Sequence, residues 1–60
     1  MNTFEAIMII EGGDADPDVT IEAWQLLIDT GLVWSLQGWY GRTAARLIED
    51  GICTASNRGE

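Results

Sequence analysis

Residues 16–31, DPDVTIEAWQLLIDTG, carry a start signal, a run of apolar residues and a stop signal for one helix. Asp16 suits the N-cap, and Pro17 suits the first helical position, where its missing amide hydrogen costs no hydrogen bond. Gly31 suits the left-handed cap that ends many helices. The pattern therefore predicts a helix over residues 17–30. Its apolar residues cover an arc wider than one packed face needs: Val19, Ile21, Ala23, Trp24, Leu26, Leu27 and Ile28.

The segment before this helix, TFEAIMIIE at residues 3–11, is apolar nearly all round. Asn2 and Glu5 have the spacing of a capping box, which predicts a helix beginning at Thr3. The short apolar run IMII at 7–10 is also typical of a strand. The capping box and the missing alternation favour a helix to about Glu11, ended by the glycines at 12 and 13.

The segment after Gly31 predicts a short helical turn at residues 33–37, VWSLQ, and then a third helix. We expect this helix to begin at Trp39 or Tyr40 and to end at Asp50, before Gly51. Its core stripe is Tyr40, Ala44, Leu47 and Ile48. The expected fold is an all-α domain of three helices over residues 1–53, with a short helical turn between the second and third helices. Residues 54–60, TASNRGE, are expected to form a flexible polar tail.

The small size of the chain predicts that it associates with itself. A domain of this length buries only about 60% of the surface of its unfolded chain. Cys53 is the only cysteine and the chain has no histidine, so neither an internal disulfide nor a His/Cys zinc site can staple the fold. Because 47% of the residues are hydrophobic, we expect a homo-oligomer in which part of the apolar surface is covered by another copy.

Charge and hydropathy exclude two classes of partner. The chain has ten acidic residues against three arginines, a net charge of −7, and such a surface repels nucleic acid phosphates. It suits a basic protein surface instead. No apolar run approaches the length of a membrane span, and the N-terminus lacks the basic region of a secretory signal. We therefore expect a cytosolic protein with one reduced thiol.

The acidic residues before the second helix raise the question of a cation site. Asp14, Asp16 and Asp18 have the D-x-D-x-D spacing that begins a calcium loop. The pattern then fails, since Val19 stands where glycine belongs and Gln25 where glutamate belongs. The simpler interpretation is that these acids favour the positive N-terminus of the helix. We predict no metal and no cofactor.

Two arginines lie on one face of the expected third helix. Arg46 and Asp50 are four residues apart, the spacing of an ordinary helical ion pair. Arg42 falls in the first turn, where the helix dipole favours acids instead. It either reaches Asp14 or Asp16, within the chain or across an interface, or holds an anion together with amides at the helix N-terminus.

The aromatic residues point to a binding surface. Three tryptophans of about 200 Å² each exceed what a core of this length needs, so at least one, for which we choose Trp39, is expected at the surface. Tryptophan, tyrosine and arginine are enriched in binding hot spots. The predicted binding residues are Trp34, Trp39, Tyr40, Arg42 and Arg46. Catalysis is not expected, because Ser35, Thr43 and Cys53 have no evident base.

The segment from Leu27 to Cys53 resembles a family of small uncharacterised proteins of tailed bacteriophages. The shared motif is LIDTG at 27–31, then Trp34, LQG at 36–38, YGR at 40–42, and Leu47, Ile48, Gly51 and Cys53. This resemblance implies a phage accessory protein that acts in the host cytoplasm, and it brings no site residue with it.

These observations lead to two hypotheses of function. The first is a non-enzymatic phage accessory or host-interaction protein that acts by protein–protein binding and self-association, with a host protein as a possible partner. The alternative is a small binding protein that sequesters a nucleotide-like or other phosphorylated ligand at GWYGR, residues 38–42.

Overall fold

The computed structural model describes residues 1–55, and its elements are all helical: α1 (Thr3–Gly12), α2 (Pro17–Thr30), the 3-10 turn η1 (Leu32–Ser35) and α3 (Gly38–Glu49). The predicted all-α, three-helix fold with a short helical turn between its second and third helices is therefore confirmed. Of the predicted polar tail, residues 56–60 lie outside the described residues.

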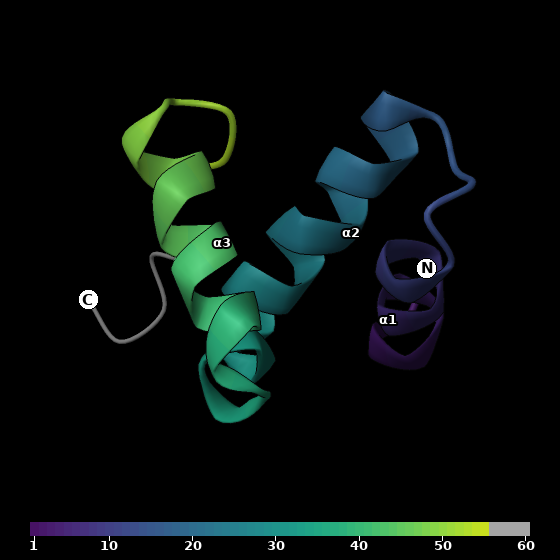
Figure 1. Ribbon diagram of the computed structural model, residues 1–60, viewed down its shortest axis with the longest axis horizontal. Coiled ribbons are helices and arrows are strands. Elements are labelled where there is room, and N and C mark those ends of the chain that lie inside the picture. Colours follow the sequence, from purple (N-terminus) through teal and green to yellow (C-terminus); the bar gives the residue numbers. More distant parts are fainter. Residues whose placement is uncertain (56–60) are drawn as a thin grey trace.

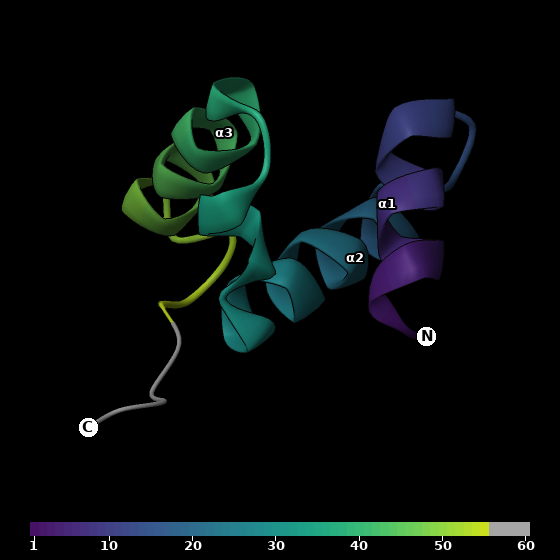
Figure 2. The same cartoon turned by 90° about the horizontal axis from the view of Figure 1, so that it is seen from below.

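Helix α2 runs through the middle of the molecule. Figures 1 and 2 show α1 on one side of it and α3 on the other. This position explains why the apolar arc of α2 is so wide, because two neighbours must be covered instead of one. The buried residues of α2 are Ala23, Trp24, Leu27 and Ile28.

Helix α1 begins with the predicted capping box. The Asn2 side chain accepts a hydrogen bond from the Glu5 amide at 2.8 Å, and the Glu5 carboxylate accepts one from the Asn2 amide at 3.1 Å. The helix is one residue longer than expected, since Gly12 is still helical and Gly13 takes the left-handed conformation at φ 73°. These local signals decide between helix and strand at residues 7–10.

Small side chains allow α1 and α2 to pack closely. Ala6 and Ala23 are both fully buried, and two alanines at a contact let helix axes approach closely. Ala6 is nevertheless the one buried residue of α1, although Ile7, Ile9 and Ile10 pack partly against the core. A helix that is apolar nearly all round is thus covered on one side.

Helix α3 begins at Gly38, slightly earlier than expected, and ends in a full Schellman motif. The Gly51 amide donates to the Ile48 carbonyl at 3.1 Å, and the Ile52 amide donates to the Leu47 carbonyl at 2.9 Å. Gly51 has φ 79°, a conformation in which a side chain is strained. The chain then turns back so that Cys53 is buried against the helices.

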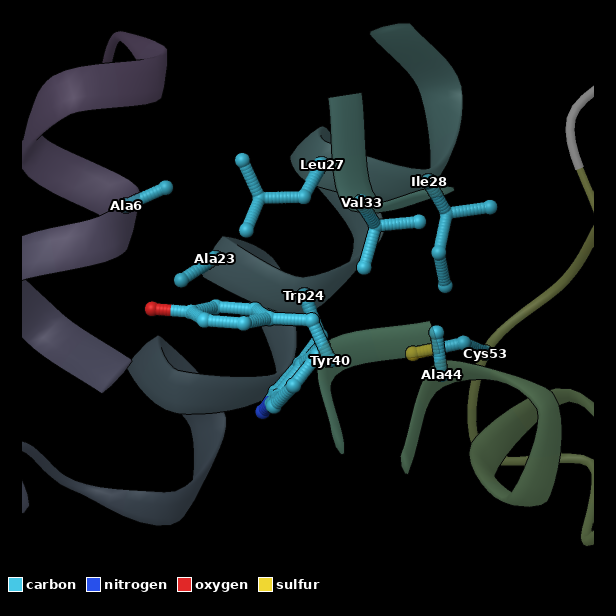
Figure 3. Packing of buried hydrophobic residues seen from close by; sticks show 9 residues of the cluster. All are labelled: Ala6, Ala23, Trp24, Leu27, Ile28, Val33, Tyr40, Ala44 and Cys53. Atoms are coloured by element: carbon cyan, nitrogen blue, oxygen red, sulfur yellow. The ribbon is translucent and has the colours of Figure 1, made fainter. Parts of the chain in front are cut away.

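The core lies where the three helices and η1 meet, around α2 (Figure 3). Its centre is aliphatic, and an aromatic group lies beside it. The buried residues are Ala6, Ala23, Trp24, Leu27, Ile28, Val33, Tyr40, Ala44 and Cys53.

Candidate functional site

Two of the predicted binding residues form an aromatic cluster with the core. The rings of Trp39 and Tyr40 are stacked, with centroids 4.0 Å apart. Trp24 meets the Trp39 ring edge to face at 6.3 Å. Trp39 is 37% exposed, so one part of its indole packs on the cluster and the other part reaches solvent. These contacts hold the Trp39 indole in place, and its exposed part can contact a binding partner.

Tyr40 lies inside the molecule, not at its surface. Its side chain is 3% exposed, and its hydroxyl donates a hydrogen bond to the Glu11 carboxylate of α1. Figure 3 shows this hydroxyl pointing past Ala23 toward α1. Burial, and then the hydrogen bond and negative charge of Glu11, raise the pKa of Tyr40 to about 12. Tyr40 is therefore not a surface residue, and its buried ring packs against the inner side of the Trp39 ring.

Trp34 is the most exposed of the three tryptophans, at 53%. It comes from η1, and one edge of its ring lies over α3, with Cε3 3.6 Å from where a Cβ of Gly41 would stand. The expectation that at least one indole is exposed is confirmed. Trp34 shows more surface than Trp39, the residue chosen from the sequence.

Arg42 and Arg46 are both exposed. The predicted pair is confirmed, since Arg46 Nε lies 3.6 Å from Asp50 Oδ2; a pair this exposed adds little stability. Arg42 forms no ion pair with any residue in 1–55. The expected contact with Asp14 or Asp16 within one chain is wrong, because the Arg42 side chain folds back along its own helix instead. Its Nη1 atom lies 3.2 Å from where a Cβ of Gly38 would stand.

The N-terminus of α3 has no side-chain cap. Gln37, at the N-cap position, uses its side-chain oxygen to accept a hydrogen bond from the Trp39 indole at 3.1 Å. The first amides of α3 and the Arg42 guanidinium thus lie at the same end of this helix. Helix amides and an arginine are both donors that suit an anion.

A second surface, on α1, was not predicted as a site. Phe4 is 69% exposed and Met8 59%, and with Met1 they line a shallow depression that also includes Glu5 and Ile9. A second depression continues it and shares Met8 and Ile9. Its other lining residues are Gly12, Asp14 and Ala15. The sequence did hold a signal for this surface, because a helix that is apolar all round needs cover on every side.

A contact between α2 and the segment after α3 was also missed. The side-chain amide of Gln25 donates to the Thr54 carbonyl at 2.9 Å and accepts from the Thr54 amide at 2.9 Å. The same amide group donates to Asp29 at 3.0 Å. Thr54, the first residue of the predicted tail, is therefore bound to α2. The two partners are 29 residues apart in sequence, and no local pattern joins them.

The described residues offer little for metal or nucleophilic chemistry. No three acidic, cysteine or histidine side chains among residues 1–55 are grouped so that they could hold a metal ion. Cys53 is buried, and burial, together with the nearby Asp29 charge, raises the pKa of its thiol. A raised pKa lowers the fraction of reactive thiolate. Within the same part of the chain, no helix is long and apolar enough to cross a membrane.

Comparison with known proteins gives a family. Neither the curated proteins nor the solved structures contain a match to this chain. A family model does match, over residues 2–59, which is nearly the whole sequence. The chain therefore belongs to the family described as Domain of unknown function (DUF7417).

Proposed function

We propose that this protein is a non-enzymatic phage accessory or host-interaction protein that binds other proteins and associates with itself in the host cytoplasm. The observation that carries the proposal is the amount of apolar side-chain surface left open. Large apolar side chains are exposed on α1, η1, α3 and the segment after it: Met1, Phe4, Met8, Trp34, Trp39 and Ile52. Scattered apolar residues are normal on a protein surface, but here they include two of three tryptophans and one whole side of a helix.

The same open apolar surface favours binding over catalysis. The one thiol of the chain, Cys53, is buried and its pKa is raised, which lowers the fraction of reactive thiolate. The phage assignment is supported by the resemblance of residues 27–53, and it remains our proposal.

We assign self-association to the surface of Trp34, Trp39, Arg42 and Arg46. Trp34 offers a large ring that is supported by α3 at Gly41. Arg42 has no acidic partner within residues 1–55, and an acidic chain offers many carboxylates on a second copy. Trp34 packs at Gly41, and Arg42 follows Gly41 in α3; tryptophan and arginine are the residue types enriched in interface hot spots.

Light scattering on the purified protein tests this assignment. The wild-type mass is expected to exceed that of the 6.6 kDa chain and to rise with concentration. Trp34→Gln is expected to shift the mass toward the monomer, since it removes the anchor without emptying the core. Phe4→Gln is the matched control, because it replaces an aromatic residue on α1 that is even more exposed than Trp34. A strictly monomeric wild-type protein at tens of micromolar would contradict self-association.

The alternative function is the binding of a phosphorylated small molecule at residues 38–42. It is favoured by the position of Arg42 at the uncapped end of α3. A thermal-shift screen with nucleotides and inorganic phosphate tests it. Stabilisation that disappears in Arg42→Ala but survives in Arg46→Ala would replace protein binding by ligand binding as the main proposal. No shift with any of these compounds removes the alternative.

A further inference from the structure

We infer that the outer side of α1 is a docking surface for a basic amphipathic helix of another protein. This inference rests on the proposed function, since it names a surface and a class of partner for protein binding. We call this surface the α1 face and define it by the residues that line its two continuous depressions: Met1, Phe4, Glu5, Met8, Ile9, Gly12, Asp14 and Ala15.

The shape of the α1 face suits a helix laid along it. Phe4 and Met8 are four residues apart in α1, so they lie on one side of the helix, and Met1, which precedes the helix, lines the same depression. Figures 1 and 2 show α1 at the edge of the molecule, with α2 and α3 on one side of it only. On α1 itself, Phe4 and Met8 are both more than half exposed. A stripe at this spacing matches the apolar positions of a partner helix at i, i+3/i+4 and i+7.

The chemistry of the stripe also favours a peptide-like partner. Phe4 provides a rigid aromatic contact, and it is the most exposed large apolar side chain in residues 1–55. Met1 and Met8 are unbranched and adaptable, and methionine is common on surfaces that accept helical segments of varied sequence.

The charge around the stripe selects a basic partner. Every charged side chain before Arg42 is Asp or Glu, and the sequence there contains no lysine or arginine. Glu5 lines one depression of the α1 face and Asp14 lines the other. Lysines or arginines flanking the apolar side of a partner helix would therefore meet carboxylates at both ends, and complementary charge speeds association and excludes wrong partners.

The same charges disfavour a second copy of this chain at this surface. Two α1 faces brought together would place acidic rims against each other, and like charges in contact oppose association. Self-association is therefore expected at the surface of Trp34, Trp39, Arg42 and Arg46. Partner binding is expected at the α1 face. The two activities use different residues and are separable by mutation.

The experiment uses designed peptides as probes, with binding measured by fluorescence anisotropy at low and high salt. The first is an 18-residue helix with a leucine stripe flanked by lysines. The second replaces the lysines by glutamates. The third has the composition of the first in an order that forms no apolar side. We expect the full-length protein to bind the first peptide at least tenfold more tightly than either of the others, which is about 1.4 kcal/mol. We also expect the binding to weaken with salt.

Variants of the protein show where the peptide binds. Phe4→Gln and Met8→Gln are each expected to weaken binding at least tenfold and to leave helicity unchanged, because both side chains are more than half exposed. Glu5→Gln keeps the capping box, in which glutamine serves as well, and is expected to weaken binding severalfold and to reduce its salt dependence. Glu49→Gln removes the same charge at the end of α3 and is expected to change neither the affinity for the peptide nor its salt dependence.

Each contrary result has its own meaning. Equal affinity for the lysine and glutamate peptides would overturn the basic partner. Binding that survives Phe4→Gln but is lost in Trp34→Gln would move the site away from α1 and leave protein binding intact. A dimer that dissociates in Phe4→Gln would show that a second copy covers the α1 face. No peptide binding by a monomeric protein would overturn the inference and the proposed function together.

Discussion

The hydroxyl of Tyr40 in α3 donates a hydrogen bond to the carboxylate of Glu11 in α1. Figures 1 and 2 show α1 and α3 on either side of α2, so this bond joins the two outer helices across the central one. It links the helix that carries the α1 face to the helix that carries Trp39 and Arg42.

Replacing Tyr40 by phenylalanine is expected to reduce the free energy of unfolding by about 1 kcal/mol. A hydrogen bond to a charged group is worth about 1.5–3 kcal/mol, but Glu11 is exposed and water will solvate its carboxylate in the variant. Urea unfolding measures the change. Glu11→Gln is the matched variant, and the double variant should lose less than the sum of the two single losses. Strict additivity would show that the two groups are not coupled.

Stability is expected to fall between about pH 10 and pH 12. The pKa of Tyr40 is raised from 10.0 to about 12 in the folded protein. Above pH 10 the unfolded chain therefore loses its phenolic proton while the folded chain keeps it. Because the unfolded state then binds fewer protons, stability decreases as the pH rises.

Absorbance of the phenolate checks this directly, since Tyr40 is the only tyrosine. The folded protein should titrate near 12, and the same protein in denaturant should titrate near 10. Tyr40→Phe should flatten the pH dependence of unfolding in this range. A folded-state midpoint near 10 would be inconsistent with a buried, hydrogen-bonded hydroxyl.

The amide of Gln25 is expected to protect Cys53. Its two hydrogen bonds to Thr54 hold the residue that follows the buried thiol. Gln25→Leu removes both bonds, so alkylation of Cys53 by iodoacetamide should become at least several times faster. The expected loss of stability is about 1–3 kcal/mol, from two bonds of about 0.5–1.5 kcal/mol each. Glu22→Gln, an exposed position on the same helix, should leave the alkylation rate unchanged. Equal rates in the Gln25→Leu variant and the wild type would mean that packing alone shields the thiol.

Two glycine-to-alanine substitutions are expected to differ in their effect on stability. Gly51 has φ +79°, and a side chain in this left-handed conformation costs about 1–2 kcal/mol. Gly51→Ala should therefore destabilise the protein by about that amount. Gly12 is helical, and a Cβ there meets nothing within 4 Å. Gly12→Ala should be neutral or stabilise by about 0.5 kcal/mol. Thermal unfolding of both variants measures the difference, and equal destabilisation by both would contradict the Schellman end of α3.

The sequence by itself determined the helices, because the signals that begin and end a helix act over a few residues. Asn2 and Glu5 fix the start of α1, Pro17 fixes the start of α2, and Gly31 and Gly51 follow the ends of α2 and α3. The Arg46–Asp50 pair was equally predictable, since both residues lie on one helix. The excess of apolar residues on α1 was visible too, but not which side of the helix stays open.

Only the tertiary structure decided which surfaces are covered and which distant groups meet. Periodicity tells that α1 is apolar nearly all round, but the structure buries the side that carries Ala6 and leaves Phe4 and Met8 outside. The contacts Tyr40–Glu11 and Gln25–Thr54 each join residues 29 positions apart. Arg42 lies along its own helix, although acidic partners are common in the chain. The physical reason is the same in each case: a helical pattern fixes the direction of a side chain around its own axis, whereas its neighbours depend on how the axes pack together.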